Sequence, residues 1–538
     1  MTEHKHIGKI VGALMAAVAF CLIVTLFADR FVAVSGSSAT TMEYESTLFD
    51  TSEIMTVNII MDEDQWQELL DNAISEEYYA CDVEINGEMI SNVGIRTKGN
   101  TSLSSIANDP DTDRYSFKIK FDKYVDGQTC MGLDKLVLNN NFADATNRKE
   151  ALVYDMFQYL GADASLYHYS KISVNGEYWG TYLALEAVED SFKLRNYGVS
   201  DGNLYKPETM GMGNDQKEDG GKPDGNPPER PNNADFPSSE EGDLAKDNNP
   251  MDRPERPQGD FDQADMDEKF RNPQGDPGDF GNRNGGADLN YTDDDADSYS
   301  TIWDGADGKV TDSDKERVVT AIKNINEGTN LTTYLDVDNI LKYMAVHEFV
   351  VNLDSLSGNM AHNYYLYEND GQLNIIPWDY NLSFGGMTNG GMGGGPGRES
   401  TESSGATSMI NDPIDTPFDG TDFFDALLEN EEYLAQYHEY LRQLAEEYVQ
   451  GGRLQEVWER LDAQTDELIE TDPTAFYTAA EYEEAKETLW TVLHLRAESV
   501  LGQLDGTIPS TDDGQQNAQD TLIDGSAIDL SVMGEFNH

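Results

Sequence analysis

The chain has 538 residues, a formal charge of −65 and a pI near 4.1. Such an excess of acidic groups argues against a nucleic acid or an anionic membrane surface as a partner. It suits a basic protein substrate, or simply keeps an exported domain soluble. The length allows one large core or two moderate ones.

An apolar run lies close to the N-terminus. Residues 10–27 are an uninterrupted apolar run of 18 that follows Lys5 and Lys9. This length can span a bilayer, whereas the apolar core of a cleavable signal usually has about 7–15 residues. We therefore expect residues 1–30 to be an uncleaved transmembrane signal anchor, with a cleaved signal peptide as the alternative. The lysines place the body outside the cytoplasm, behind a polar stalk over residues 31–53.

Alternating stretches after the stalk predict an antiparallel sheet within residues 54–206. The predicted strands cover 55–61, 80–86, 91–98, 116–122 and a hairpin over 170–186 that turns at Asn175-Gly176. A helix is expected around residues 62–73. A second, over 145–161, is amphipathic and ends at Gly161.

Residues 207–290 break this pattern. They hold eleven of the chain's eighteen prolines, are rich in Asp, Gly and Asn, and contain almost no aliphatic side chains. Such a segment cannot bury enough apolar surface to offset its ordering entropy, so we predict a disordered acidic insertion. A second low-complexity stretch covers residues 385–408.

The remainder is predicted to be helical. Within residues 291–506, helices are expected over 313–326, 335–353, 421–429, 431–449, 453–470 and 479–504. Residues 507–538 form an acidic tail that we expect to be loose. His347 lies inside one of these helices and is expected to pack in the core.

The segment 352–385 carries the clearest chemical pattern. Asp354 lies in a loop, Asn363 directly precedes a short aromatic strand, and Asp379 follows the next strand, shortly before Phe384-Gly385. Phosphoryl transfer needs one carboxylate to orient or deprotonate the acceptor hydroxyl, and an amide plus a second carboxylate to hold metal. Asp354 is therefore the candidate base, and Asn363 and Asp379 are the candidate metal ligands. Asn359 is the alternative to Asn363 as the amide ligand, because it follows Asp354 at the spacing found in the protein-kinase catalytic loop.

Two lysines on one predicted strand are candidates for phosphate binding. Lys118 and Lys120 alternate with apolar residues, so they share one face of the strand. By analogy with the strand lysine of protein kinases, one of them is expected to contact the phosphates of a nucleotide. A plain solvent-facing pair is the alternative. Cys81 and Cys130 could form a disulfide in an oxidising compartment, but the sequence does not show whether they meet.

Six motifs in order resemble the spore-coat protein H (CotH) family of atypical, secreted protein kinases. They are IRTKGNTS (95–102), SFKIKF (116–121), NGEYWGTYLALE (175–186), NLYK (203–206), HNYYLY (362–367) and PWDYNLSFGG (377–386). The resemblance implies an α+β, divergent protein-kinase-like fold with an antiparallel sheet lobe and a helical lobe. ATP would bind between the two lobes, together with magnesium or manganese.

The resemblance also points to cofactor-binding positions. Lys98, Asn100 and Ser102 lie in the glycine loop and would offer backbone amides and hydroxyls to phosphates. Glu186 and Lys206 match family positions at the cleft, without an assigned role. The implied activity is transfer of the γ-phosphoryl group of ATP to Ser or Thr of a spore-coat or cell-envelope protein. The alternative is a non-catalytic surface adhesin or envelope-assembly scaffold with the same fold.

Overall fold

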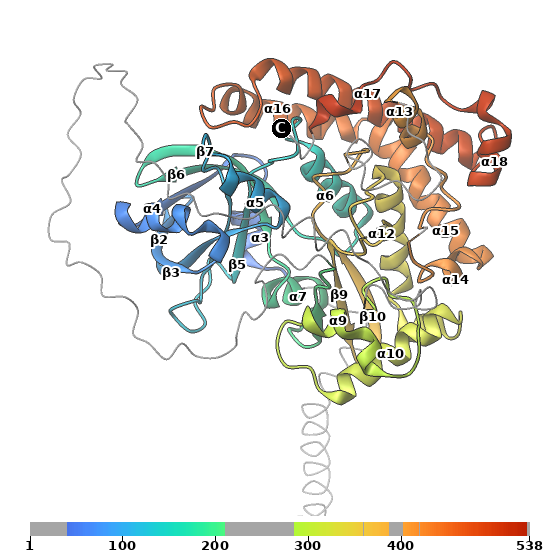
Figure 1. The fold of residues 1–538 in the computed structure, drawn as a ribbon, viewed down its shortest axis with the longest axis horizontal. Helices are drawn as coiled ribbons and strands as arrows, with labels where there is room; N and C mark the ends of the chain where they lie inside the picture. The colour runs from blue at the N-terminus through green and yellow to red at the C-terminus, as the bar shows by residue number, and fades with distance from the viewer. Residues whose placement is uncertain (1–39, 210–284, 359, 387–401, 419, 535–538) are drawn as a thin grey trace, which may run out of the picture. The chain divides into compact units, whose positions relative to one another are not determined.

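The computed structural model describes residues 40–209, 285–358, 360–386, 402–418 and 420–534 (Figure 1). The chain has the mixed α+β character that the sequence predicted. The apolar run 10–27, most of the insertion and Asn359 lie outside the described residues. Within the described ranges, no helix has both the length and the apolar character needed to cross a bilayer.

Seven strands form a closed barrel in the order β1-β2-β3-β4-β5-β7-β6. Neighbouring strands are antiparallel except β1 and β6, which pair in parallel with Val57 opposite Ile172. The predicted antiparallel sheet is therefore closed on itself, and the closure leaves its edge strands paired. The strands are β1 (Met55–Ile60), β2 (Tyr79–Ile85), β3 (Glu88–Lys98), β4 (Ser116–Lys120), β5 (Lys135–Asn139), β6 (Tyr167–Val174) and β7 (Glu177–Glu186).

Strand alternation fills the barrel with apolar side chains. Phe117 and Ile119 of β4 are fully buried, and the lysines between and after them are half-exposed on the outer face. The turn at Asn175-Gly176 has positive φ at both residues, as the sequence predicted for a tight hairpin. Cys81 and Cys130 are both buried and unpaired with each other, so the structure contains no disulfide between them.

Four helices accompany the barrel strands. They are α3 (Glu43–Thr47), α4 (Glu63–Asp71), α5 (Thr101–Asn108) and α7 (Asp190–Tyr197). The stalk prediction is wrong for residues 42–53, because Tyr44, Leu48 and Phe49 are buried against the barrel. The prediction followed the polar composition of this stretch and overlooked its three closely spaced apolar residues, which bind it to the barrel.

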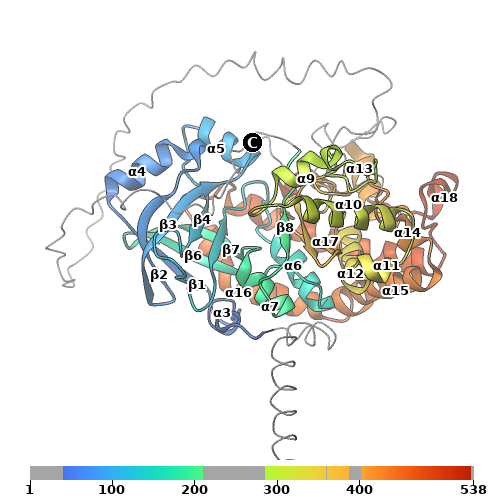
Figure 2. The same cartoon turned by 90° about the horizontal axis from the view of Figure 1, so that it is seen from below.

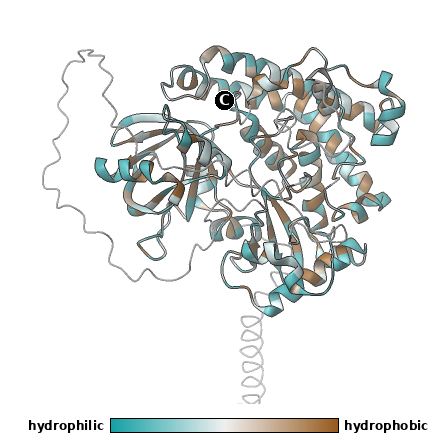
Figure 3. Ribbon diagram, in the orientation of Figure 1, coloured by the Kyte–Doolittle hydropathy of each residue, from teal (hydrophilic) through white to brown (hydrophobic). Residues whose placement is uncertain are grey.

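A second sheet and a set of helices form the remainder. The sheet has the order β10-β9-β8, with β8 (Asn203–Tyr205), β9 (Tyr364–Asn369) and β10 (Gln372–Pro377). The predicted helices are present as α10 (Asp312–Asn326), α12 (Val337–Val350), a shorter α14 (Asp425–Leu428), α15 (Glu431–Arg442) continued by the π-helical turn η3 (Gln443–Val449), α16 (Arg453–Glu470) and α17 (Ala479–Leu504). Three further helices were not predicted: α9 (Ser300–Asp304), α11 (Leu331–Tyr334) and α13 (Glu402–Ile410), which begins inside the low-complexity stretch. Their apolar sides, brown in Figure 3, face inward.

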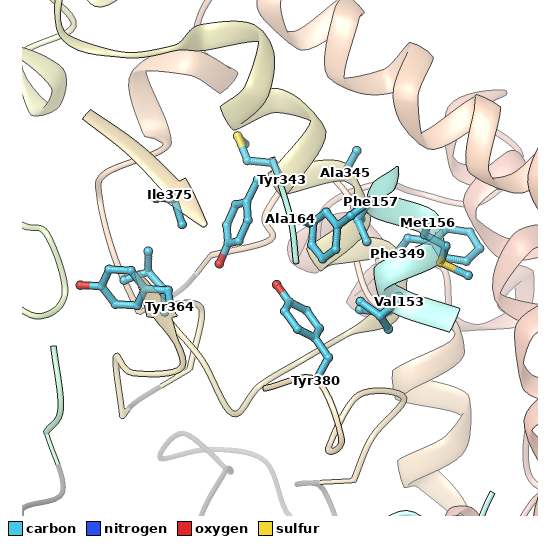
Figure 4. Close-up of a cluster of buried hydrophobic side chains, with 14 of the residues drawn as sticks. Val153, Met156, Phe157, Ala164, Tyr343, Ala345, Phe349, Tyr364, Ile375 and Tyr380 are labelled. Atoms are coloured by element: carbon cyan, nitrogen blue, oxygen red, sulfur yellow. The ribbon is translucent and has the colours of Figure 1, made fainter. Parts of the chain in front are cut away.

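Helix α6 (Lys149–Leu160) lies between the barrel strands, α12 and the C-terminal helices (Figures 1 and 2). It ends at Gly161, which has φ of 68°, as the sequence predicted. Phe157 of α6 packs edge-on against Tyr380 at 5.4 Å and stacks on Tyr343 at 6.2 Å. Figure 4 shows the hydroxyl ends of these two tyrosines pointing toward one another beside α6. The helix thus rests on the segment that follows β10.

Residues 507–534 of the C-terminal tail are ordered rather than loose. Beyond α17 it forms α18 (Asp512–Asn517), η4 (Gln519–Thr521) and η5 (Leu530–Met533). Leu530 and Met533 are buried in the large core, and the amide of Ala145 donates to the carbonyl of Met533 at 3.1 Å. The prediction from acidic composition is wrong because a few apolar residues in the tail are enough to dock it.

Candidate functional site

Asp379 lies directly after β10 in a strained backbone conformation. Its φ is +60°, a left-handed value that non-glycine residues seldom adopt. Such strain persists where the surrounding structure enforces it, and it clusters at functional sites. Asp379 is half-buried and follows a strand that is buried from Leu373 to Pro377. The backbone thus aims an aspartate at one defined place, as the sequence pattern indicated.

Asp354 and Asn363 meet at this place. The Nδ2 atom of Asn363 donates to the Asp354 carbonyl at 2.8 Å and to its Oδ2 at 3.0 Å. Asn363 also has positive φ, at 57°. Because its amide nitrogen is engaged by Asp354, its amide oxygen is the atom suited to a metal ion. The structure brings the candidate base and one candidate ligand into contact.

His362 lies on the other side of Asp354. Its Nε2 is 2.9 Å from Asp354 Oδ1. Burial alone lowers the pKa of His362, but the hydrogen bond and charge of Asp354, with the charges of Glu208 and Asp379, raise it overall. The imidazolium form of His362 is therefore more favoured than in a free histidine. No role for this histidine was predicted from the sequence.

The charges around Asp379 suit a cation. Burial, and then the charge of Asp354, raise the pKa of Asp379, while Lys98, Lys206 and His362 act to lower it. Two acids that act on each other electrostatically favour a positive ion near them. In the described ranges no three His, Cys, Asp or Glu side chains form a metal-binding group. Magnesium fits such a sparse set, because it keeps waters and substrate phosphates as its other ligands.

Lys98 reaches the same site from the end of β3. Its Nζ donates to Asn139 Oδ1 at 2.8 Å and lies 5.9 Å from the centre of the Trp378 ring. Among the charges that lower the pKa of Asp379, that of Lys98 has the largest effect. Lys98 was predicted from the sequence only as part of the glycine loop. The structure places its ammonium group at the site as well.

Glu150, on the first turn of α6, completes this chain of contacts. Asn139 Nδ2 donates to Glu150 Oε2 at 2.8 Å, so the asparagine links the lysine to the glutamate. The other carboxyl oxygen is buried and accepts no hydrogen bond from the described residues. Burial and the charge of Asp379 raise the pKa of Glu150 to about 8. Glu150 was not predicted as a site residue; the one signal for it in the sequence is an acid on the buried side of an amphipathic helix.

The glycine loop turns from β3 into α5. Gly99 has φ of +130°, and a Cβ there would lie 2.8 Å from Ser102 Oγ, so the turn requires glycine. Asn100 occupies the N-cap position of α5 without a side-chain capping bond. Ser102 follows on the first turn. These positions are compatible with backbone contacts to a phosphate.

Lys118 and Lys120 lie on β4, beside the strand that carries Lys98. In the β3–β4 register Ser116 is opposite Lys98, Lys118 is opposite Arg96 and Lys120 is opposite Gly94. The predicted shared face of the two lysines is therefore correct. The strand lysine whose charge acts on Asp379 is Lys98, on the neighbouring strand.

Glu186 and Lys206 have different surroundings. Glu186 is fully buried and accepts from Arg195 Nε at 3.0 Å, Tyr44 Oη at 2.6 Å and the Leu166 amide at 3.0 Å. It therefore joins β7, α7 and the N-terminal segment. Lys206, at the end of β8, pairs with Glu208 at 2.6 Å and contributes to the charges on Asp379. Of these two positions, the structure brings Lys206 to the site.

His347 connects the loops that carry the two aspartates. Its Nδ1 lies 3.0 Å from the hydroxyl of Tyr380, and its Nε2 lies 2.7 Å from Ser357 and 3.0 Å from Ser355. Burial lowers its pKa to about 3, so the ring is neutral and has one donor and one acceptor nitrogen. The prediction of a packed core histidine is confirmed. Its contacts with both loops were not foreseen.

The site thus combines a hydrogen-bonded aspartate, an amide and carboxylate for a cation, and a lysine held by an asparagine and a glutamate. This is the set of groups found in phosphoryl-transfer proteins. The sequence profile described as CotH kinase protein matches residues 95–500. Because the match covers most of the chain, the protein belongs to the CotH kinase protein family. Among curated proteins, none matches the chain.

Proposed function

We propose that the protein is an ATP- and magnesium-dependent kinase that phosphorylates Ser or Thr of a protein. One observation carries the proposal: side chains from the barrel, α6 and the segment 354–379 converge on Asp379. In this view the barrel is the nucleotide-covering lobe of a divergent kinase-like fold, and the helical part carries the catalytic loops. Membership of the CotH kinase family supports the same activity.

Lys98 is the proposed phosphate-binding lysine. Asn139 and Glu150 hold its side chain toward Asp379, as the strand lysine of kinases is held by a helix glutamate. Lys206 adds a second positive charge on the same side. Lys118 stays a candidate for a more distant part of the nucleotide, since it shares the face of Lys98. Backbone amides of residues 98–102 would complete the phosphate contacts.

Asp354 is the proposed base. Its hydrogen bonds from Asn363 and its contact with His362 fix the orientation of its carboxyl group. It would align the acceptor hydroxyl and take its proton. Asn363 and Asp379 would hold magnesium, which supplies positive charge to the phosphates when bound.

The acceptor is proposed to be a basic, Ser-rich protein of the spore coat or cell envelope. A chain with a formal charge of −65 attracts basic partners over long range. A signal anchor within residues 1–30 would tether the body outside the cytoplasm. External protease should then degrade the body in intact cells and leave a membrane-bound fragment. Full protection from protease would contradict this orientation, and a shortened form in the medium would support the cleaved signal peptide.

Replacing the carboxylate of Asp379 tests the activity. Full-length Asp379→Asn should lose at least about a hundredfold in transfer rate, the scale of metal and electrostatic groups. Labelled ATP with magnesium or manganese and basic Ser-rich proteins provides the assay. Asp370→Asn, in the hairpin turn between β9 and β10, is the matched control and should keep the wild-type rate.

The outcome separates the kinase from the scaffold alternative. Transfer by the wild type that is lost in Asp379→Asn, with an unchanged melting temperature, supports catalysis. Wild-type protein that neither binds nor turns over nucleotide would favour the adhesin or assembly scaffold. Near-wild-type transfer by Asp379→Asn would exclude the proposed role of this residue.

A further inference from the structure

Helix α6 presents two opposite faces to two different parts of the molecule. Residues 150, 154 and 157 face the site: Glu150 and Tyr154 lie near Asp379, and Phe157 packs on Tyr380. Residues 148, 155 and 159 stand about 180° away at a helical period of 3.6. They contact the C-terminal helices instead. Because the helix is a rigid element, contacts that fix this second face also fix the position of Glu150.

Arg148, the N-cap residue of α6, makes the strongest of these contacts. Its side chain is fully buried and pairs with Asp462 and, at 2.8 Å, with Asp466, both on α16. It also donates to the Tyr482 hydroxyl of α17 at 2.5 Å. Its guanidinium group lies 5.2 Å from the centre of the Trp458 ring. One cation thus joins the start of α6 to both helices of the α16–α17 hairpin.

Lys486 of α17 ties the two acids together. Its Nζ lies 2.9 Å from Asp466 and 3.4 Å from Asp462. Tyr482 donates to Asp466 at 2.6 Å, so the group is a network rather than a single pair. Networks of this kind hold one geometry better than isolated surface pairs do.

A second anchor lies two turns along the same face. Asp155 of α6 is buried and accepts from Arg453 of α16 at 2.8 Å and from the Tyr167 hydroxyl at 2.9 Å. Arg460 of α16 donates to the same tyrosine at 2.7 Å. Two separated anchors restrict both translation and rotation of a helix, which a single contact does not.

We propose that the α16–α17 hairpin is a positioning element that clamps α6 through Arg148 and Asp155 and thereby holds Glu150 against Asn139 and Lys98. Arg148 and Asp155 are positioning residues, because they act on the site only through α6. The inference rests on the proposed kinase function for its catalytic consequence, but the clamp itself is a property of the fold. The helix that carries the site glutamate is then fixed within the chain, without a partner or a modification.

The test compares Arg148→Met with Arg442→Met in the full-length protein. Arg442 pairs with Glu446 at 3.0 Å and with Asp505 at 3.2 Å among the same C-terminal helices, and these contacts do not involve α6. Arg148→Met should speed hydrogen exchange of the amides of residues 149–155 and lower kcat about tenfold. Arg442→Met should change neither.

A double-mutant cycle distinguishes positioning from general loss of stability. If Arg148 acts through Glu150, then Arg148→Met should lower kcat by less than about twofold in a Glu150→Gln background. Equal losses in both backgrounds would show that Arg148 acts by another route and would overturn the proposal. Should Arg148→Met fail to fold, Asp462→Asn replaces it, since that carboxylate is 35% exposed and its loss is milder.

Hydrogen exchange and kcat test different parts of the proposal. Unchanged exchange in α6 of Arg148→Met would refute the clamp, whatever the activity. Faster exchange with an unchanged kcat would refute the link to the site. Wild-type protein without any transfer would refute the proposed kinase, and the exchange measurement would still decide the clamp.

Discussion

Two buried glutamates near the junction of barrel and helices differ in how completely they are paired. Glu186 accepts bonds at both oxygens from Arg195, Tyr44 and the Leu166 amide. Glu150 has one oxygen bonded to Asn139 and the other without a hydrogen bond from the described residues, and Asp379 raises its pKa. Burial of an acid is thus no sign of function by itself. Incomplete pairing beside a second acid is such a sign.

Removing the charge of Glu186 should have the larger effect on stability. Glu186→Gln leaves Arg195 buried without its counter-charge, and breaking a buried pair in this way destabilises by about 3 kcal/mol. Urea denaturation of the full-length protein should show the loss. An unchanged midpoint would mean that the complete pairing of Glu186 contributes nothing to the fold.

Glu150→Gln should have the opposite effect on stability. The neutral amide keeps a hydrogen bond to Asn139 and removes an acid that is unfavourably buried beside Asp379. We expect the melting temperature without nucleotide to rise by roughly 2–4 °C, while transfer falls about tenfold. A variant that loses both stability and activity would show that Glu150 belongs with Glu186 as a structural acid.

The gain from Glu150→Gln should depend on pH. The folded pKa of Glu150 is about 8, well above its usual value of 4.5, so the folded chain holds a proton that the unfolded chain releases in this interval. Wild-type stability therefore falls as pH rises from 4.5 to 8 because of this group. The advantage of Glu150→Gln should be larger at pH 8 than at pH 5. Denaturation curves at both values measure it, and an equal advantage would contradict the raised pKa.

The contacts that the sequence could predict are mostly local. Asp354, Asn363 and Asp379 lie within one short segment, and the structure places them together as the order of motifs indicated. The helical period correctly predicted α6, α10, α12, α16 and α17. The end of α6 at Gly161 and the hairpin turn at Asn175-Gly176 could also be predicted, because their backbone conformations favour few residue types.

The missed contacts join distant parts of the chain. Lys98, Asn139 and Glu150 come from three elements, and no periodicity shows that β3, β5 and α6 meet. The same holds for the parallel pairing of β1 with β6, which closes the barrel. The tail was misjudged because its composition is acidic, although two apolar residues dock it.

The clamp on α6 has a consequence for the order in which the protein becomes functional. The start of α6 precedes its anchors on α16 and α17 by more than three hundred positions in the chain. During synthesis the N-terminal part emerges first. We therefore expect nascent or C-terminally shortened chains to hold Glu150 poorly against Asn139 and Lys98. Correct positioning of this glutamate would then wait for the synthesis of α16 and α17.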